Sequence, residues 1–152
     1  MKKIALVLII ICTAGTFSVH SEKELLKPET GTLFVLVRGF KSKIGQLMVA
    51  LYNNAADFPN KEPYKGSTTK ISADVELIKF ENIPYGDYAI AVLHDINKDG
   101  KLDKNFFGIP TEGYGFSNNA VEKFGPPSFL KASFAFASWN AKKIIGLEYG
   151  IP

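Results

Sequence analysis

The sequence contains a single cysteine, Cys12, which lies within the apolar N-terminal segment. If that segment is removed, the remaining chain has no thiol, which excludes disulfides, thiol catalysis and cysteine metal sites. Histidine is almost as scarce, with only His20 and His94. Loss of the N-terminus would leave one, so a zinc site built from several histidines is excluded as well. The domain must be stabilised by its core or by a bound metal.

Basic residues form no continuous stripe. The whole chain carries 18 lysines and arginines against 15 acids, a formal charge of +3. Removal of Lys2 and Lys3 leaves 16 minus 15, or +1. This distribution indicates neither nucleic-acid binding nor attraction to an anionic membrane surface.

The first 21 residues have the layout of a secretory signal peptide. Lys2 and Lys3 precede an unbroken apolar run from Ile4 to Ile11, and small or polar residues continue to Ser21. We therefore expect a signal peptide over 1–21, a polar linker over 22–30 and one domain over 31–152. The bulky Ile11 before Cys12 argues against a lipoprotein. The processed protein would be periplasmic or secreted, with no membrane span.

The rest of the chain contains short runs of alternating apolar and polar residues between Gly, Pro and Asn turns. No sustained helical period is present, so the pattern predicts an all-β fold, an antiparallel β-sandwich of about seven strands. A slip in the alternation near Leu77 and Ile78 suggests a bulge. The expected strands are Thr32–Val37, Gln46–Tyr52, Asp74–Phe80, Asp87–His94, Ser133–Ala137 and Lys143–Tyr149, with Thr68–Ser72 as a weaker candidate and one helical turn over Ala55–Phe58.

A segment of 34 residues, Ile96–Phe129, has no convincing strand. Unstructured connections longer than about 12–15 residues are uncommon in compact domains unless they are functional or held in place. A bound ion at the root of this loop would hold it. Packing of aromatic side chains onto the end of the sandwich would also hold it, and the two explanations are compatible. The aromatic candidates are Phe106, Phe107, Tyr114, Phe116 and Phe124.

The start of this segment has the spacing of a calcium-binding loop. Oxygen-bearing side chains occupy positions 1, 3, 5 and 9, a turn glycine, Gly100, occupies position 6, and a backbone carbonyl follows at position 7. Position 12 is Phe106, so the glutamate that closes an EF-hand loop is missing, and Glu112 is the nearest acid that could complete the shell. The predicted calcium ligands are Asp95, Asn97, Asp99, the Lys101 carbonyl, Asp103 and Glu112.

The same residues have a simpler interpretation. Asp and Asn side chains commonly hydrogen-bond their own backbone in turns, so this string could be a well-formed loop without metal. Magnesium fits less well than calcium, because it requires strict octahedral geometry and binds few protein carboxylates.

Three blocks of sequence form a specific pattern: Pro84–Val92 with His94–Asp95 and the acidic loop, Gly108–Asn118, and Gly125–Phe129. In these blocks the chain resembles the bacterial domain-of-unknown-function family 2141. The resemblance covers the domain from about Thr32 to the C-terminus. It implies an exported single-domain protein with an immunoglobulin-like or prealbumin-like β-sandwich, and no established activity.

Three functions remain open. The first is a non-catalytic exported binding or scaffold domain with a calcium loop. The second is a carbohydrate- or cell-surface-binding module, since aromatic rings and amides suit stacking on sugars; its ligand residues would be Tyr114, Phe116, Asn118 and Asn119. The third is a small hydrolase with His94 as general base near Ser117 or Glu112. We expect the first, a non-enzyme with an extracytoplasmic protein or glycan partner.

Overall fold

The computed structural model describes residues 30–122 and 125–150 as nine strands, one short α-helix and one 3-10 turn. The expected signal peptide, the linker up to residue 29 and Phe124 lie outside these residues. The elements are β1 Thr30–Arg38, β2 Gln46–Tyr52, β3 Lys65–Thr69, β4 Val75–Pro84, β5 Gly86–Asp95, β6 Gly113–Phe116, η1 Ser117–Asn119, α1 Phe129–Ala132, β7 Phe134–Phe136, β8 Asn140–Gly146 and β9 Glu148–Tyr149.

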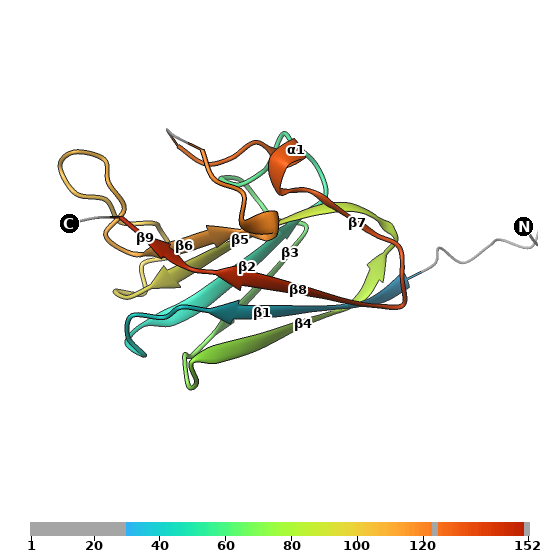
Figure 1. Ribbon diagram of the computed structural model, residues 1–152, viewed down its shortest axis with the longest axis horizontal. Helices are drawn as coiled ribbons and strands as arrows, with labels where there is room; N and C mark the ends of the chain where they lie inside the picture. Colours follow the sequence, from blue (N-terminus) through green and yellow to red (C-terminus); the bar gives the residue numbers. More distant parts are fainter. Residues whose placement is uncertain (1–29, 123–124, 151–152) are drawn as a thin grey trace, which may run out of the picture.

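The strands form two sheets packed face to face, which confirms the predicted all-β sandwich (Figure 1). One sheet has the order β4-β1-β8, and the other has the order β3-β2-β5-β6-β9. Strand β7 pairs with the first residues of β5, along the edge that β6 occupies further on. All pairs are antiparallel except β1 with β8, which run parallel.

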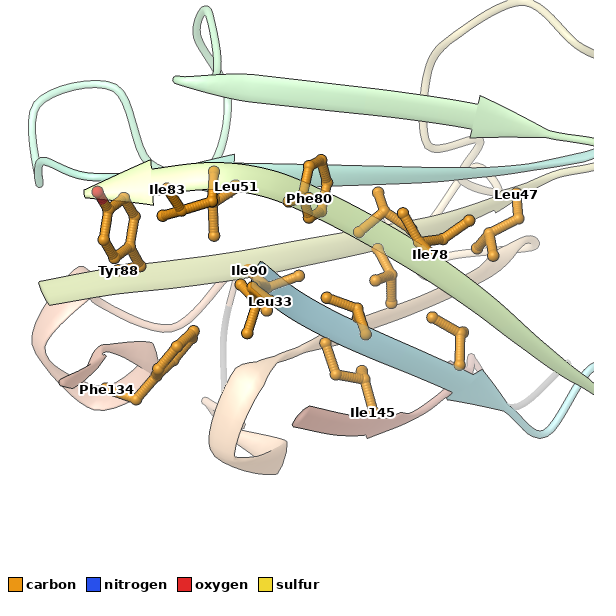
Figure 2. Close-up of a cluster of buried hydrophobic side chains, with 14 of the residues drawn as sticks. Leu33, Leu47, Leu51, Ile78, Phe80, Ile83, Tyr88, Ile90, Phe134 and Ile145 are labelled. Carbon is orange, nitrogen blue, oxygen red and sulfur yellow. The ribbon is translucent and has the colours of Figure 1, made fainter. Parts of the chain in front are cut away.

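Apolar side chains from both sheets fill the space between the layers (Figure 2). Alternate residues of each strand point inward, because successive side chains of a strand face opposite sides of its sheet. In β2 and in much of β5, buried residues alternate with half-buried ones. The outward Phe34 and Leu36 of β1 are only half-buried, so this strand is not fully covered on both faces. The buried residues of β1, β2 and β5 are Leu33, Val35, Val37, Leu47, Val49, Leu51, Tyr88, Ile90 and Val92.

Several boundaries differ from those expected. The bulge lies at Glu81 and Asn82 rather than at Leu77–Ile78, because Gly31 pairs with Ile83 while Leu33 pairs with Phe80. Asn82 takes a φ of 56°, which an asparagine tolerates better than most residues.

The C-terminal segment expected as one strand is two. Strand β8 pairs with β1 and strand β9 pairs with β6, so the chain changes sheets at Leu147. The weaker candidate Thr68–Ser72 is replaced by β3 at Lys65–Thr69, and the expected helical turn over 55–58 is a series of turns.

Candidate functional site

The connection between β5 and β6 projects beyond one end of the sandwich (Figure 1). Strand β5 ends at Asp95, β6 begins at Gly113, and His94 pairs with Gly113. Both ends of the loop are therefore held side by side by one antiparallel ladder. The expectation of 34 residues without a strand was wrong, because β6 lies inside that segment. The loop that needs an explanation is residues 96–112.

Asp95 fixes the first turn of this loop. Its carboxylate is fully buried and accepts the backbone N–H of Lys98 at 2.7 Å and of Gly100 at 3.0 Å, with a longer bond of 3.2 Å from the Asp99 N–H. Gln46, the residue opposite on β2, donates its Nε2 at 2.8 Å. Burial raises the pKa of Asp95, but these hydrogen bonds outweigh burial and hold the pKa below that of an ordinary aspartate.

Glu112 fixes the far side of the loop in the same way. It is buried at the end of the loop, and its two oxygens accept different backbone groups. Oε1 accepts the Ile96 N–H at 2.6 Å, and Oε2 accepts the Asp103 N–H at 3.1 Å. One glutamate thus ties the first residue of the loop to the middle, as an ion at this place would.

Three of the predicted ligands lie on the outer side of this frame. Asn97 and Asp99 are exposed and Asp103 is half-buried. Asn97 Nδ2 donates to Asp103 Oδ2 at 2.9 Å, so positions 3 and 9 of the loop are in contact. The backbone N–H of Lys101 donates to Asp99 Oδ1 at 2.9 Å. Within the described ranges 30–122 and 125–150, no group of three or more His, Cys, Asp or Glu side chains is close enough to hold a metal.

His94 is buried and uses both ring nitrogens. Nε2 lies 2.8 Å from the Ile44 carbonyl oxygen, so it carries the proton and donates. Nδ1 lies 2.7 Å from the Tyr149 hydroxyl, which also accepts the Lys41 N–H at 3.0 Å. The structure brings neither Ser117 nor Glu112 into hydrogen-bonding contact with the ring.

Ser117 has a separate structural role. Its buried hydroxyl accepts the Ile90 N–H at 2.9 Å and donates to the Ala132 carbonyl at 2.6 Å. These two bonds join the end of β6 to β5 and to α1. A catalytic nucleophile would instead need a free lone pair and a neighbouring base.

The residues expected to bind sugar make different contacts within the fold. Tyr114 and Phe116 belong to β6 and lie half-buried, and Phe116 makes an edge contact with Phe58 at 5.8 Å between ring centres. Asn118 Nδ2 donates to the Ser133 carbonyl at 2.7 Å. Asn119 lines a small hollow with Tyr114 and Phe116. The hollow has a volume of about 20 Å³, which holds one water molecule rather than a sugar ring.

Two of the aromatic residues expected to pack on the sandwich do not do so. Phe106 is 97% exposed and Phe107 is 82% exposed, so the aromatic explanation of the loop is wrong for both. A wider cleft of about 310 Å³ lies beside the loop. It is lined by Lys41, Ile96, Asn105, Pro110, Thr111, Tyr149 and Gly150.

Sequence reasoning missed three residues that organise this end of the molecule. Gln46 completes the hydrogen bonds of Asp95, and Tyr149 completes those of His94; both lie on strands that are distant in the sequence. Gly45 lies so close to Asp95 that a Cβ would come within 2.2 Å of its carbonyl oxygen. A glycine directly before a strand was the only signal in the sequence, and it did not identify the partner.

Comparison with known proteins agrees with the resemblance seen in the sequence. The model of a bacterial family described as "Uncharacterized protein conserved in bacteria (DUF2141)" matches residues 35–144, from within β1 to within β8. No curated protein and no solved structure matches the chain. In the described part of the chain, no helix is long and apolar enough to cross a membrane. The match covers most of the sequence, and the chain therefore belongs to the DUF2141 family.

Proposed function

We propose that this protein is an exported, non-catalytic binding or scaffold domain whose 95–112 loop binds calcium. The observation that carries the proposal is the contact between Asn97 and Asp103 at 2.9 Å. It brings together two oxygen-bearing side chains that calcium loops use at positions 3 and 9. Asp99, at position 5 between them, is exposed.

The hydrogen bonds divide the six predicted ligands into two groups. A carboxylate offers about four lone-pair positions, and Asp95 fills four with N–H donors. We therefore assign Asp95 to holding the turn. Glu112 accepts two donors and keeps acceptor capacity. The cation would be held by Asn97, Asp99 and Asp103 with the Lys101 carbonyl, and Glu112 would complete the shell.

The loop acids are not engaged with basic side chains, which leaves them to a cation: none of them forms an ion pair within the part of the chain that the structure describes. Asn97 and Asp103 meet through an amide N–H, so the Asn97 amide must turn to present its oxygen to the ion. The site has few carboxylate ligands, and the Asn97 amide must reorient before calcium binds. We therefore expect weak binding, with a dissociation constant on the order of 10⁻³ M, as in extracellular modules.

The test is thermal unfolding with and without calcium at constant ionic strength. At about ten times the dissociation constant, linkage adds roughly 1.4 kcal/mol, or about 5 °C in the melting temperature of a domain of this size. Asp99→Asn should remove the increment. Asp87→Asn, an exposed aspartate outside the loop, should keep it. An unchanged melting temperature of the wild type in calcium, with magnesium as reference, would overturn the proposal.

The non-catalytic part rests on His94 and Ser117, whose polar atoms are engaged in buried hydrogen bonds. A broad hydrolase screen should find no turnover that depends on His94. Turnover by the wild type that is lost in a folded His94→Gln variant would contradict this part.

The proposed location outside the cytoplasm rests on Lys2, Lys3 and the apolar run Ile4–Ile11. Mass spectrometry of the protein from its native host should find the N-terminus near residue 22. An intact N-terminus would contradict export.

A further inference from the structure

Two adjacent phenylalanines form the tip of the 95–112 loop. Phe106 and Phe107 are 97% and 82% exposed, and their rings meet edge to face with centres 5.6 Å apart. Exposing an apolar side chain of this size costs about 1.5–3 kcal/mol relative to burial. Single exposed apolar residues are ordinary, but a projecting pair on a loop tip marks a surface that meets something else.

The tip is a turn in which several backbone groups are hydrogen-bonded within the loop. Lys104 and Pro110 form a bridge across its base. Asn105 organises the turn: its N–H donates to the Ile109 carbonyl, its carbonyl accepts the Gly108 N–H, and its side-chain oxygen accepts the N–H groups of Phe107 and Ile109, all at 2.9–3.0 Å. These internal partners lower the cost of bringing the turn to a bilayer interface, because lipid offers none.

Lysines outnumber acids among the exposed charged residues of the 95–112 loop. Lys98, Lys101 and Lys104 are exposed, and none of them forms an ion pair within the described ranges. Two of the four acids of the same loop, Asp95 and Glu112, are buried and accept backbone N–H groups. Asp99 is exposed and Asp103 is half-buried, so the fold leaves three exposed lysines against one exposed acid, an excess that the sequence alone does not indicate.

We propose that this tip docks the domain on an anionic lipid bilayer. Phe106 and Phe107 would enter the interface, and Lys98, Lys101 and Lys104 would lie at the level of the lipid phosphates. Aromatic rings beside lysines are the combination that binds such interfaces. A projecting tip suits a bilayer better than a protein surface, where large side chains gain most in a matching pocket. The inference does not require calcium, although a cation on Asp99 and Asp103 would strengthen it.

The experiment is co-sedimentation of the folded domain with vesicles of equal parts phosphatidylcholine and phosphatidylglycerol, in chelator. Wild type should pellet with these vesicles, less so in high salt, and weakly with pure phosphatidylcholine. The variant Phe106→Ser/Phe107→Ser should bind about tenfold or more weakly, since it loses two insertable rings. The variant Lys98→Gln/Lys101→Gln/Lys104→Gln should also lose about tenfold or more.

Matched controls change the same residue types elsewhere. Trp139→Ser removes an aromatic side chain that is 74% exposed between β7 and β8, and it should bind as wild type does. Lys61→Gln/Lys70→Gln/Lys142→Gln removes three exposed lysines outside the loop and should retain most of the binding.

The proposal is overturned if wild type stays in the supernatant, or if the loop variants and their controls lose binding equally. It is also overturned if sedimentation velocity shows a dimer that only the Phe106→Ser/Phe107→Ser variant abolishes while no form pellets. The tip would then be a contact between copies of the chain.

Discussion

Replacement of Asp95 by asparagine tests the assignment of this residue to the frame of the loop. The side chains have nearly the same shape, but an amide has one acceptor oxygen and one donor nitrogen. In either orientation the nitrogen faces two N–H donors: Lys98 and Asp99, or Gly100 and Gln46. Losing two charge-assisted bonds at a buried site should cost about 3 kcal/mol. The melting temperature should fall by about 10 °C.

The matched control is Asp99→Asn, because Asp99 is exposed and its side chain accepts one backbone hydrogen bond, from Lys101 at 2.9 Å. It should cost less than about 1 kcal/mol. Urea unfolding followed by circular dichroism measures both variants. Equal stability of the two variants would refute the assignment.

The effect of pH gives an independent check on Asp95. Its pKa in the folded protein is lowered, so the stability it contributes is fully present above the unfolded-state pKa of about 3.9. That contribution is lost as the pH falls through the folded-state pKa. Wild type should therefore lose stability below about pH 4–5 more steeply than Asp95→Asn. Part of the acid sensitivity should persist in the variant, because the pKa of Glu76 is also lowered: hydrogen bonds from Ser72 and Ala73 outweigh the effect of burial.

Two further substitutions test the same end of the sandwich. Gly45→Ala should lower the free energy of unfolding by more than about 2 kcal/mol, because φ is +88° and the new Cβ would lie 2.2 Å from the Asp95 carbonyl oxygen. Gly100→Ala, with φ of +80° and open space around the new Cβ, should lower it by only about 1 kcal/mol. Equal urea midpoints for the two variants would contradict this. Tyr149→Phe removes the hydroxyl between His94 and Lys41 and should lower the free energy of unfolding by about 1–3 kcal/mol. The hydroxyl of Tyr85 makes no hydrogen bond within the described residues, so Tyr85→Phe should lower it by under about 0.5 kcal/mol. A reversed order of the two variants would show that His94 does not depend on this bond.

The sequence predicted the sandwich because alternation of apolar residues directly reflects which face of a strand is buried. Strand β2 was found with its observed bounds, and β5 to within one residue at each end. Both are central strands, where one face packs against the other sheet and the pattern is strict.

Strand β6 escaped prediction because two of its four residues are glycines, which are depleted in strands. The structure explains why both must be glycine. A Cβ on Gly113 would come within 2.6 Å of the Tyr149 ring, and one on Gly115 would come within 2.6 Å of the Gly146 carbonyl oxygen. Both contacts involve residues more than 30 positions away, so no local pattern could have indicated them.

The spacing of acids predicted a loop that gathers oxygen atoms, and it could not say how those oxygens are used. The sequence shows an aspartate at position 1 both when its carboxylate binds an ion and when it accepts four N–H groups. The difference depends on Gln46, which reaches Asp95 only because β2 pairs with β5 in one register.

The described polar and aromatic residues of this end of the molecule therefore fall into two kinds. Asp95, Glu112 and His94 are buried, and their hydrogen bonds are satisfied within the fold, so changing them should lower stability. Asp99 and Phe106 are exposed, and little else in the fold depends on their side chains. A residue that contributes little to stability is free to contact something outside the chain. Binding of calcium or lipid should thus be separable from folding. Variants of the exposed kind should lose binding and keep the melting temperature that the protein has without calcium, and variants of the buried kind should lose both.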